Sequence, residues 1–203
     1  MSQDAKLVSR IAECLPEMSK EQKQGWIENP KRLQQVLQVL AEIPSDPKVW
    51  KRITIGTGLN TDGLRQAMKD KGMRISDWAN DILGKPAFSV ATEKMDVDLV
   101  VVSVEDLGFK DGATLKDIYA AAKKRGLELC PNEVGPQLRL QYKDQPKDEW
   151  LLIGMESFTV SDGDLRVFHV AHDGSVLWLY TFYDYPDGLW RSSGRFVFVL
   201  PRK

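Results

Sequence analysis

The feature that most constrains the fold is the aromatic last quarter of the chain, residues 150–203. This stretch holds 11 of the 18 aromatic residues, and Asp-Gly pairs interrupt it at residues 162–163, 173–174 and 187–188. Asp-Gly supplies the positive φ angles that tight hairpin turns need, and the apolar runs between the pairs have the length of strands. The pattern predicts an antiparallel β-meander with more aromatic surface than one covered sheet face requires.

The composition disfavours several classes of partner. The chain has 28 Lys and Arg against 29 Asp and Glu, so no charge excess points to nucleic acid or to a basic partner. Two distant cysteines, Cys14 and Cys130, do not make a disulfide framework and favour reduced thiols in a reducing compartment. The first residues lack the pattern of a signal peptide, and no apolar run approaches the ~18 residues that span a bilayer. We therefore expect a cytoplasmic protein with no membrane partner, metal or cofactor.

Residues 1–46 have the pattern of a helical N-terminal segment. Ser19 and Gln22 have capping-box spacing, and Asn29-Pro30 is typical of a helix start. Two apolar stripes at helical spacing flank these signals: Leu7, Val8, Ile11, Cys14 and Leu15, then Leu33, Val36, Leu37, Leu40 and Ile43. The segment Pro44–Pro47 ends the third helix and is the best linker candidate.

Residues 47–203 predict an α+β domain, because helices and strands mix first and strands dominate later. We expect strands at 49–55, 88–91, 97–104 and 138–142, and helices at 61–72, 76–84 and 114–125. In the last of these strands, Leu138, Leu140 and Tyr142 alternate with polar residues, which predicts one buried and one polar face. The aromatic meander follows this strand.

The hairpin at Asp173-Gly174 has two apolar faces. A two-residue loop would pair His172 with Ser175, and the rest of the register follows from that pair. One face would then carry Phe168, Val170, Leu177 and Leu179, and the other Leu165, Val167, His169, Trp178, Tyr180 and Phe182. One face must cover the core, and the other is either covered by another element or left open for a ligand. Trp178 and Tyr180 are therefore candidate ligand-binding residues.

Three further motifs resemble metal or phosphate sites, but their spacing favours a structural role. His169 and His172 form an H-x-x-H pair, but on a strand they point to opposite faces and cannot reach one metal ion. The loop Ile55–Gly63 opens a helix, but its glycines have neither dinucleotide nor P-loop spacing. Asp162 and Asp164 have calcium-like spacing without the remainder of a calcium loop.

Two alternatives for function remain open at this stage. Cys130, in a rigid loop between two prolines, could serve as a nucleophile if Glu133, Arg139 and His169 converged on it. Residues 61–83 have the outline of a helix-turn-helix, although acidic residues on the second helix would repel DNA phosphates.

Three strings carry a resemblance to a known family. They are Met73–Leu83 with ISDWANDIL, Leu127–Leu140 with ELCP and EVGPQLRL, and Arg195–Val199, RFVFV. In these strings the chain resembles a family of bacterial proteins of unknown function, over about residues 50–203. The resemblance implies a bacterial source and a single unit after the linker, and it implies no activity, cofactor or site residue.

The leading hypothesis is a soluble, non-catalytic binding or protein-interaction module for an unknown protein or small ligand. Excess aromatic surface favours it, together with the lack of a complete catalytic signature in the sequence. Gln137, Arg139 and Gln141 add a possible row of donors on the polar face of the predicted strand.

Overall fold

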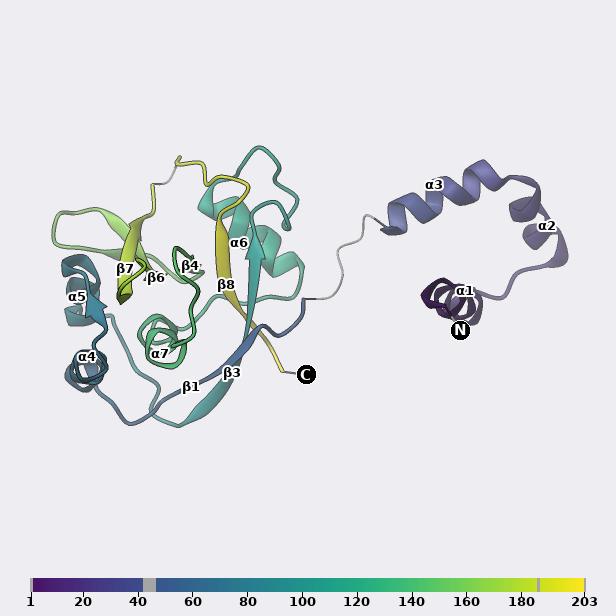
Figure 1. The fold of residues 1–203 in the computed structure, drawn as a ribbon. Coiled ribbons are helices and arrows are strands. Elements are labelled where there is room, and N and C mark those ends of the chain that lie inside the picture. Colours follow the sequence, from purple (N-terminus) through teal and green to yellow (C-terminus); the bar gives the residue numbers. More distant parts are fainter. Residues whose placement is uncertain (1, 42–46, 186, 203) are drawn as a thin grey trace. The chain divides into compact units, whose positions relative to one another are not determined.

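The computed structural model describes residues 2–41, 47–185 and 187–202. The chain divides into two compact units, Met1–Ser45 and Asp46–Lys203 (Figure 1). The first unit is helical, and the second contains the sheet. In the described parts of both units, no helix is long and apolar enough to cross a membrane.

The first unit consists of three short helices, as the sequence predicts. They are α1 (Gln3–Cys14), α2 (Lys20–Glu28) and α3 (Pro30–Ala41). The capping box at the start of α2 is confirmed, because Ser19 Oγ accepts the Gln22 N–H and the Gln22 side chain accepts the Ser19 N–H. Ile43 and most of the predicted linker at residues 44–47 lie outside the described residues.

The second unit is built on one eight-stranded sheet, which confirms the predicted α+β class. Its strands are β1 (Lys51–Ile55), β2 (Arg74–Ile75), β3 (Met95–Ser103), β4 (Trp150–Ile153), β5 (Phe158–Thr159), β6 (Leu165–His172), β7 (Leu177–Tyr183) and β8 (Arg195–Leu200). Their order in space is β1-β3-β8-β4-β6-β7-β2, with β5 paired to β6 outside this path. The pairs β2–β7 and β4–β8 are parallel, and the others are antiparallel. The last strand therefore lies in the middle of the sheet.

The sheet curls around the helix α7 (Val134–Gln141), which contacts β1 on one side and β6 and β7 on the other (Figure 1). The prediction of a strand at residues 138–142 is wrong. Residues 134–140 are all buried, so the alternation of Leu138 and Leu140 with polar residues belongs to a helix that is covered on every side. Pro136 fits because it lies in the first turn, where its missing N–H has no helical partner.

Three further helices belong to this unit, and most of their predicted caps are confirmed. They are α4 (Thr61–Asp70), which contacts α7 directly, α5 (Asp77–Gly84) and α6 (Leu115–Lys124). Ser76 caps α5 and Thr114 caps α6 as predicted, whereas α4 is capped by Asn60, one residue before the predicted Thr61. The predicted Schellman ending of α6 is present, since Gly126 has a φ of 74° and the Leu127 N–H donates to the carbonyl of Ala122.

Two other predicted elements take different forms. Residues 88–91 form a loop rather than a strand, because the Ala91 N–H donates to the buried Glu133 carboxylate instead of to a neighbouring strand. The helix pair in residues 61–83 is not joined by a simple turn. The connection contains β2, which extends the sheet by pairing with β7. The helix-turn-helix outline therefore corresponds to a helix–strand–helix unit at one edge of the sheet.

We expect Gly135→Ala to destabilise the second unit. A Cβ at Gly135 would lie 2.7 Å from the Phe168 ring, and overpacking of this kind costs about 1–3 kcal/mol. Gly84→Ala, in α5, is the matched control, because its Cβ would meet nothing closer than 3.6 Å. Urea unfolding of both variants measures the difference. An unchanged midpoint for Gly135→Ala would contradict close contact between α7 and β6.

Candidate functional site

The β6–β7 hairpin has a longer loop than the sequence predicts. His172 pairs with Leu177, so the loop contains four residues, Asp173–Val176, and the prediction of a two-residue loop is wrong. The Asp173 carboxylate accepts the Val176 N–H at 2.8 Å and the Trp178 indole N–H at 2.7 Å. These bonds lower the pKa of Asp173 to about 2 and stabilise the longer loop.

The longer loop shifts the strand pairing by two residues, which leaves each side chain on its predicted face. His169 lies opposite Tyr180 rather than opposite Trp178. The side chains of Phe168, Val170 and Leu179 are fully buried and cover the core. Because that face covers the core, only the opposite face of the hairpin can be exposed to solvent.

This other face, here called the aromatic face, is formed by side chains of β4, β6 and β7. Its members are Trp150, Leu165, His169, Trp178, Tyr180 and Phe182, while Val167, predicted on the same face, is fully buried. Leu165, Phe182 and Trp150 are 37%, 41% and 43% exposed. Trp178 stacks on Tyr180 with ring centroids 4.6 Å apart, and Trp150 stacks beside Phe182 at 6.2 Å. A partly exposed, apolar surface of this kind is typical of a binding site.

A pocket of about 380 Å³ opens at the Phe182 end of the aromatic face. Trp150 and Phe182 form one side, and the chain after β7 contributes Tyr185, Leu189 and Trp190. Trp190 is buried with its ring 4.9 Å from that of Phe182, whereas Tyr185 and Leu189 are 55% and 69% exposed. The volume lies within the range of about 300–1,000 Å³ that ligand pockets occupy.

His169 contributes to the aromatic face as an uncharged ring. It stacks on Tyr180 at 5.3 Å and meets Trp150 and Phe182 edge-on. Burial lowers the pKa of His169 to about 4, and its buried Nδ1 has no hydrogen-bond partner among the residues that the structure describes. A general base is normally oriented by a hydrogen bond to the second ring nitrogen, which His169 Nδ1 does not make here.

The four catalytic candidates, Cys130, Glu133, Arg139 and His169, have separate partners. Cys130 is 5% exposed and donates to the carbonyl of Val197 at 3.4 Å. Burial raises the pKa of its thiol, whereas a nucleophilic cysteine needs a lowered one. Within the described part of the chain, no hydrogen bond or ion pair joins any two of the four candidates.

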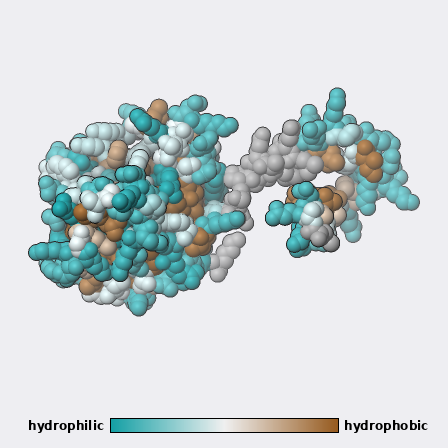
Figure 2. Space-filling model, in the orientation of Figure 1, coloured by the Kyte–Doolittle hydropathy of each residue, from teal (hydrophilic) through white to brown (hydrophobic). Residues whose placement is uncertain are grey.

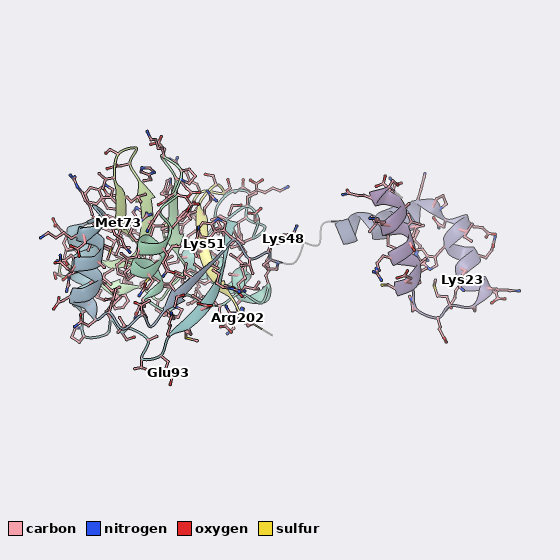
Figure 3. The ribbon with its side chains drawn as sticks, turned by 60° about the horizontal axis from the view of Figure 1, so that its bottom comes forward. Lys23, Lys48, Lys51, Met73, Glu93 and Arg202 are labelled. Atoms are coloured by element: carbon pink, nitrogen blue, oxygen red, sulfur yellow. The ribbon has the colours of Figure 1, made fainter. Side chains whose placement is uncertain are left out.

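Glu133 fills an anion site inside the protein. Each of its carboxylate oxygens lies 3.1 Å from the Gly56 N, and Ala91 N and Gln137 Nε2 each donate at 2.8 Å. Gly56 has a φ of 64°, and a Cβ there would lie 1.9 Å from the carbonyl oxygen of Glu93, which is labelled in Figure 3. The glycine N–H that might have received a phosphate in this loop therefore binds a carboxylate of the same chain.

The row of donors predicted for a polar strand face lies on the helix α7 instead. Gln137 and Gln141 are one turn apart, and Gln137 Nε2 donates to Thr57 Oγ1 at 2.7 Å. The Gln141 amide accepts the Thr54 N–H at 2.9 Å and donates to the Thr54 carbonyl at 2.8 Å. Gln141 thus imitates the peptide group of a neighbouring strand and pairs with the free edge of β1 at Thr54.

Arg139 is fully buried and has no acidic partner in the described residues. Its guanidinium donates to the carbonyls of Tyr142 and Ala171 and to the side chain of Gln145. Burial lowers the pKa of Arg139 to about 10, which leaves it charged at neutral pH. Arg139 therefore holds the chain after α7 against β6.

The remaining acidic and histidine motifs also have partners within the fold. Asp162 and Asp164 lie 2.9 and 3.7 Å from the guanidinium of Arg166. His172 Nδ1 lies 2.8 Å from the carbonyl of Gln145, while His169 belongs to the opposite face of β6. Among the described residues, no group of three His, Cys, Asp or Glu side chains is placed to hold a metal ion.

Alternation along the sequence predicts Trp178 and Tyr180 on the aromatic face but does not predict the pocket. The missed residues are Trp150, Tyr185, Leu189 and Trp190. One signal was available, because Tyr185, Leu189 and Trp190 flank the Asp187-Gly188 turn, and turn segments are normally polar.

Comparisons of the chain with protein-family models, with curated proteins and with solved structures found no match. The resemblance to a family of bacterial proteins stays a prediction.

We expect Glu133→Gln to lower the free energy of unfolding by about 1–3 kcal/mol, because an amide NH₂ would face buried N–H donors. Glu128→Gln is the matched control, since Glu128 is exposed. Urea unfolding midpoints measure both effects. Equal midpoints for the two variants would show that the Glu133 charge contributes nothing.

We expect His169 to make stability pH-dependent. Its pKa in the folded protein is about 4, below the ordinary value of 6.5, so the unfolded state binds the proton first. Stability is therefore retained above pH 6.5 and lost as the pH falls towards 4, by about 2 kcal/mol at pH 5. Urea unfolding at pH 7 and pH 5 should show this loss in the wild type and not in His169→Phe. A parallel loss in both proteins would assign it to other groups.

Proposed function

We propose that this protein is a non-catalytic binding module whose pocket receives an apolar or aromatic side chain of a partner polypeptide. One observation carries the proposal: one face of the β6–β7 hairpin covers the core, while the aromatic face is partly exposed and ends in a pocket. Reduced cysteines and the resemblance to bacterial proteins support a setting in the bacterial cytoplasm.

The chemistry of the pocket favours an uncharged ligand group. Rings and one leucine form most of its wall, and Arg191 is the only charged residue among those that line it in the described structure. Trp, Tyr and Phe are enriched at the energetically dominant positions of protein interfaces, where they bury large area with few rotatable bonds. Nucleic acid would require a basic surface, which neither the pocket nor the charge balance provides.

The proposal can be tested with small probes of known chemistry. We expect N-acetyltryptophanamide and N-acetylleucinamide to shift the NMR signals of residues around the pocket more than those of any other surface. Phe182→Ser/Leu189→Ser should abolish these shifts, because both side chains line the pocket. Met95→Ser is the control, since Met95 is 52% exposed on β3 and is not among the residues that line the pocket.

Two outcomes would contradict the proposal. Shifts that spread over the whole surface, or that persist in the double variant, would remove the pocket as a site. Stronger binding of cellobiose than of either amide would indicate a carbohydrate ligand instead of a polypeptide.

A further inference from the structure

The first unit exposes an unusual amount of apolar surface. No residue of α1 or α2 is buried. The large apolar side chains concerned are Leu7 (60% exposed), Val8 (65%), Ile11 (40%), Leu15 (53%), Ile27 (71%) and Leu33 (41%). Figure 2 shows hydrophobic residues at the surface of this unit. Helices of 12, 9 and 12 residues are marginal in water on their own, so these helices need a cover.

The polar and apolar residues of α1 lie on opposite sides of the helix. With about 100° between successive residues, Leu7, Ile11 and Leu15 share one side. The charged residues Lys6, Arg10 and Glu13 share the other, where Arg10 and Glu13 form an exposed ion pair at 2.8 Å. A partner seated on the apolar stripe would therefore meet no charge after Asp4 in the first turn.

The charge of the unit disfavours two kinds of partner, membranes and nucleic acid. Residues 1–45 contain six basic and six acidic residues, so the unit is neutral as a whole. A helix on a membrane surface has a polar face rich in Lys and Arg, and nucleic acid requires a basic patch. A second copy of the same unit is neutral and carries the same stripe, and an antiparallel pair keeps the two Asp4 carboxylates apart at opposite ends of the contact.

We propose that residues 2–41 form a self-association module, in which the apolar stripe of α1 packs against a second copy of this chain. Pairing covers the stripe that the unit itself leaves in water. It also joins two binding domains, so a partner with two sites would bind with avidity. The self-association rests on the first unit alone and is independent of the function proposed for the aromatic face.

Sedimentation equilibrium of the full chain from about 1 to 200 µM tests the proposal. We expect a concentration-dependent dimer or higher oligomer. Leu7→Ser/Ile11→Ser should weaken self-association by more than about 100-fold, because each of the two copies loses two buried aliphatic side chains. Lys6→Ser/Arg10→Ser, on the charged side, is the control for helix propensity and should have a much smaller effect. An unchanged urea midpoint of the second unit shows that both variants remain folded.

Cys14 supplies a second measurement, because it is exposed whereas the other cysteine, Cys130, is buried. We expect a thiol reagent to modify Cys14 more slowly at high protein concentration and equally fast at all concentrations in Leu7→Ser/Ile11→Ser. A wild-type chain that is monomeric at 200 µM overturns the proposal, as does an oligomer that the stripe variant leaves intact. A monomer that binds vesicles of phosphatidylserine and phosphatidylcholine through the stripe would also overturn it and would assign the stripe to membranes.

Discussion

The second unit depends on the burial of one helix whose polar side chains are bonded to the elements around it. Glu133, just before the helix, accepts from the loop after β1, and Gln141 bonds to β1 itself. Arg139 donates to the strand β6 and also to the segment between α7 and β4. A buried polar group without a hydrogen-bond partner lowers the stability of the fold by about one to several kcal/mol. These bonds therefore fix the position of α7 from several sides, and the sheet must curl to supply them.

Local signals in the sequence were sufficient for much of this fold. The caps of α5 and α6 depend on one side chain and the next turn, and the two faces of the hairpin depend only on alternation. The loop length was not predictable in this way, since alternation does not reveal the bonds from the Val176 N–H and the Trp178 indole N–H to the Asp173 carboxylate that stabilise the longer loop. The helix α7 was mistaken for a strand because a helix buried on every side has no amphipathic period to detect.

In the candidate site too, local signals were predictable and contacts between distant parts of the chain were not. Alternation along β7 placed Trp178 and Tyr180 on one face, but it could not show whether another element covers that face. The pocket was not predictable, because it brings Trp150 together with Leu189 and Trp190, about forty residues later in the sequence. The spacing between His169 and His172 does not reveal the charge of His169. That charge is determined by its burial among aromatic rings.

The position of β8 between β3 and β4 has a consequence for how the chain reaches this state. Residues 195–200 leave the ribosome after every other strand, yet they pair with strands on both sides. Until they arrive, the pair β1–β3 and the group β4–β6–β7 have no hydrogen bonds to each other through the sheet, and two inner strand edges stay open. Open edges of this kind pair readily with other chains. A nascent chain that stalls before residue 195 is therefore more exposed to aggregation than one in which β8 is in place, and a chaperone that shields these edges would act until residues 195–200 emerge.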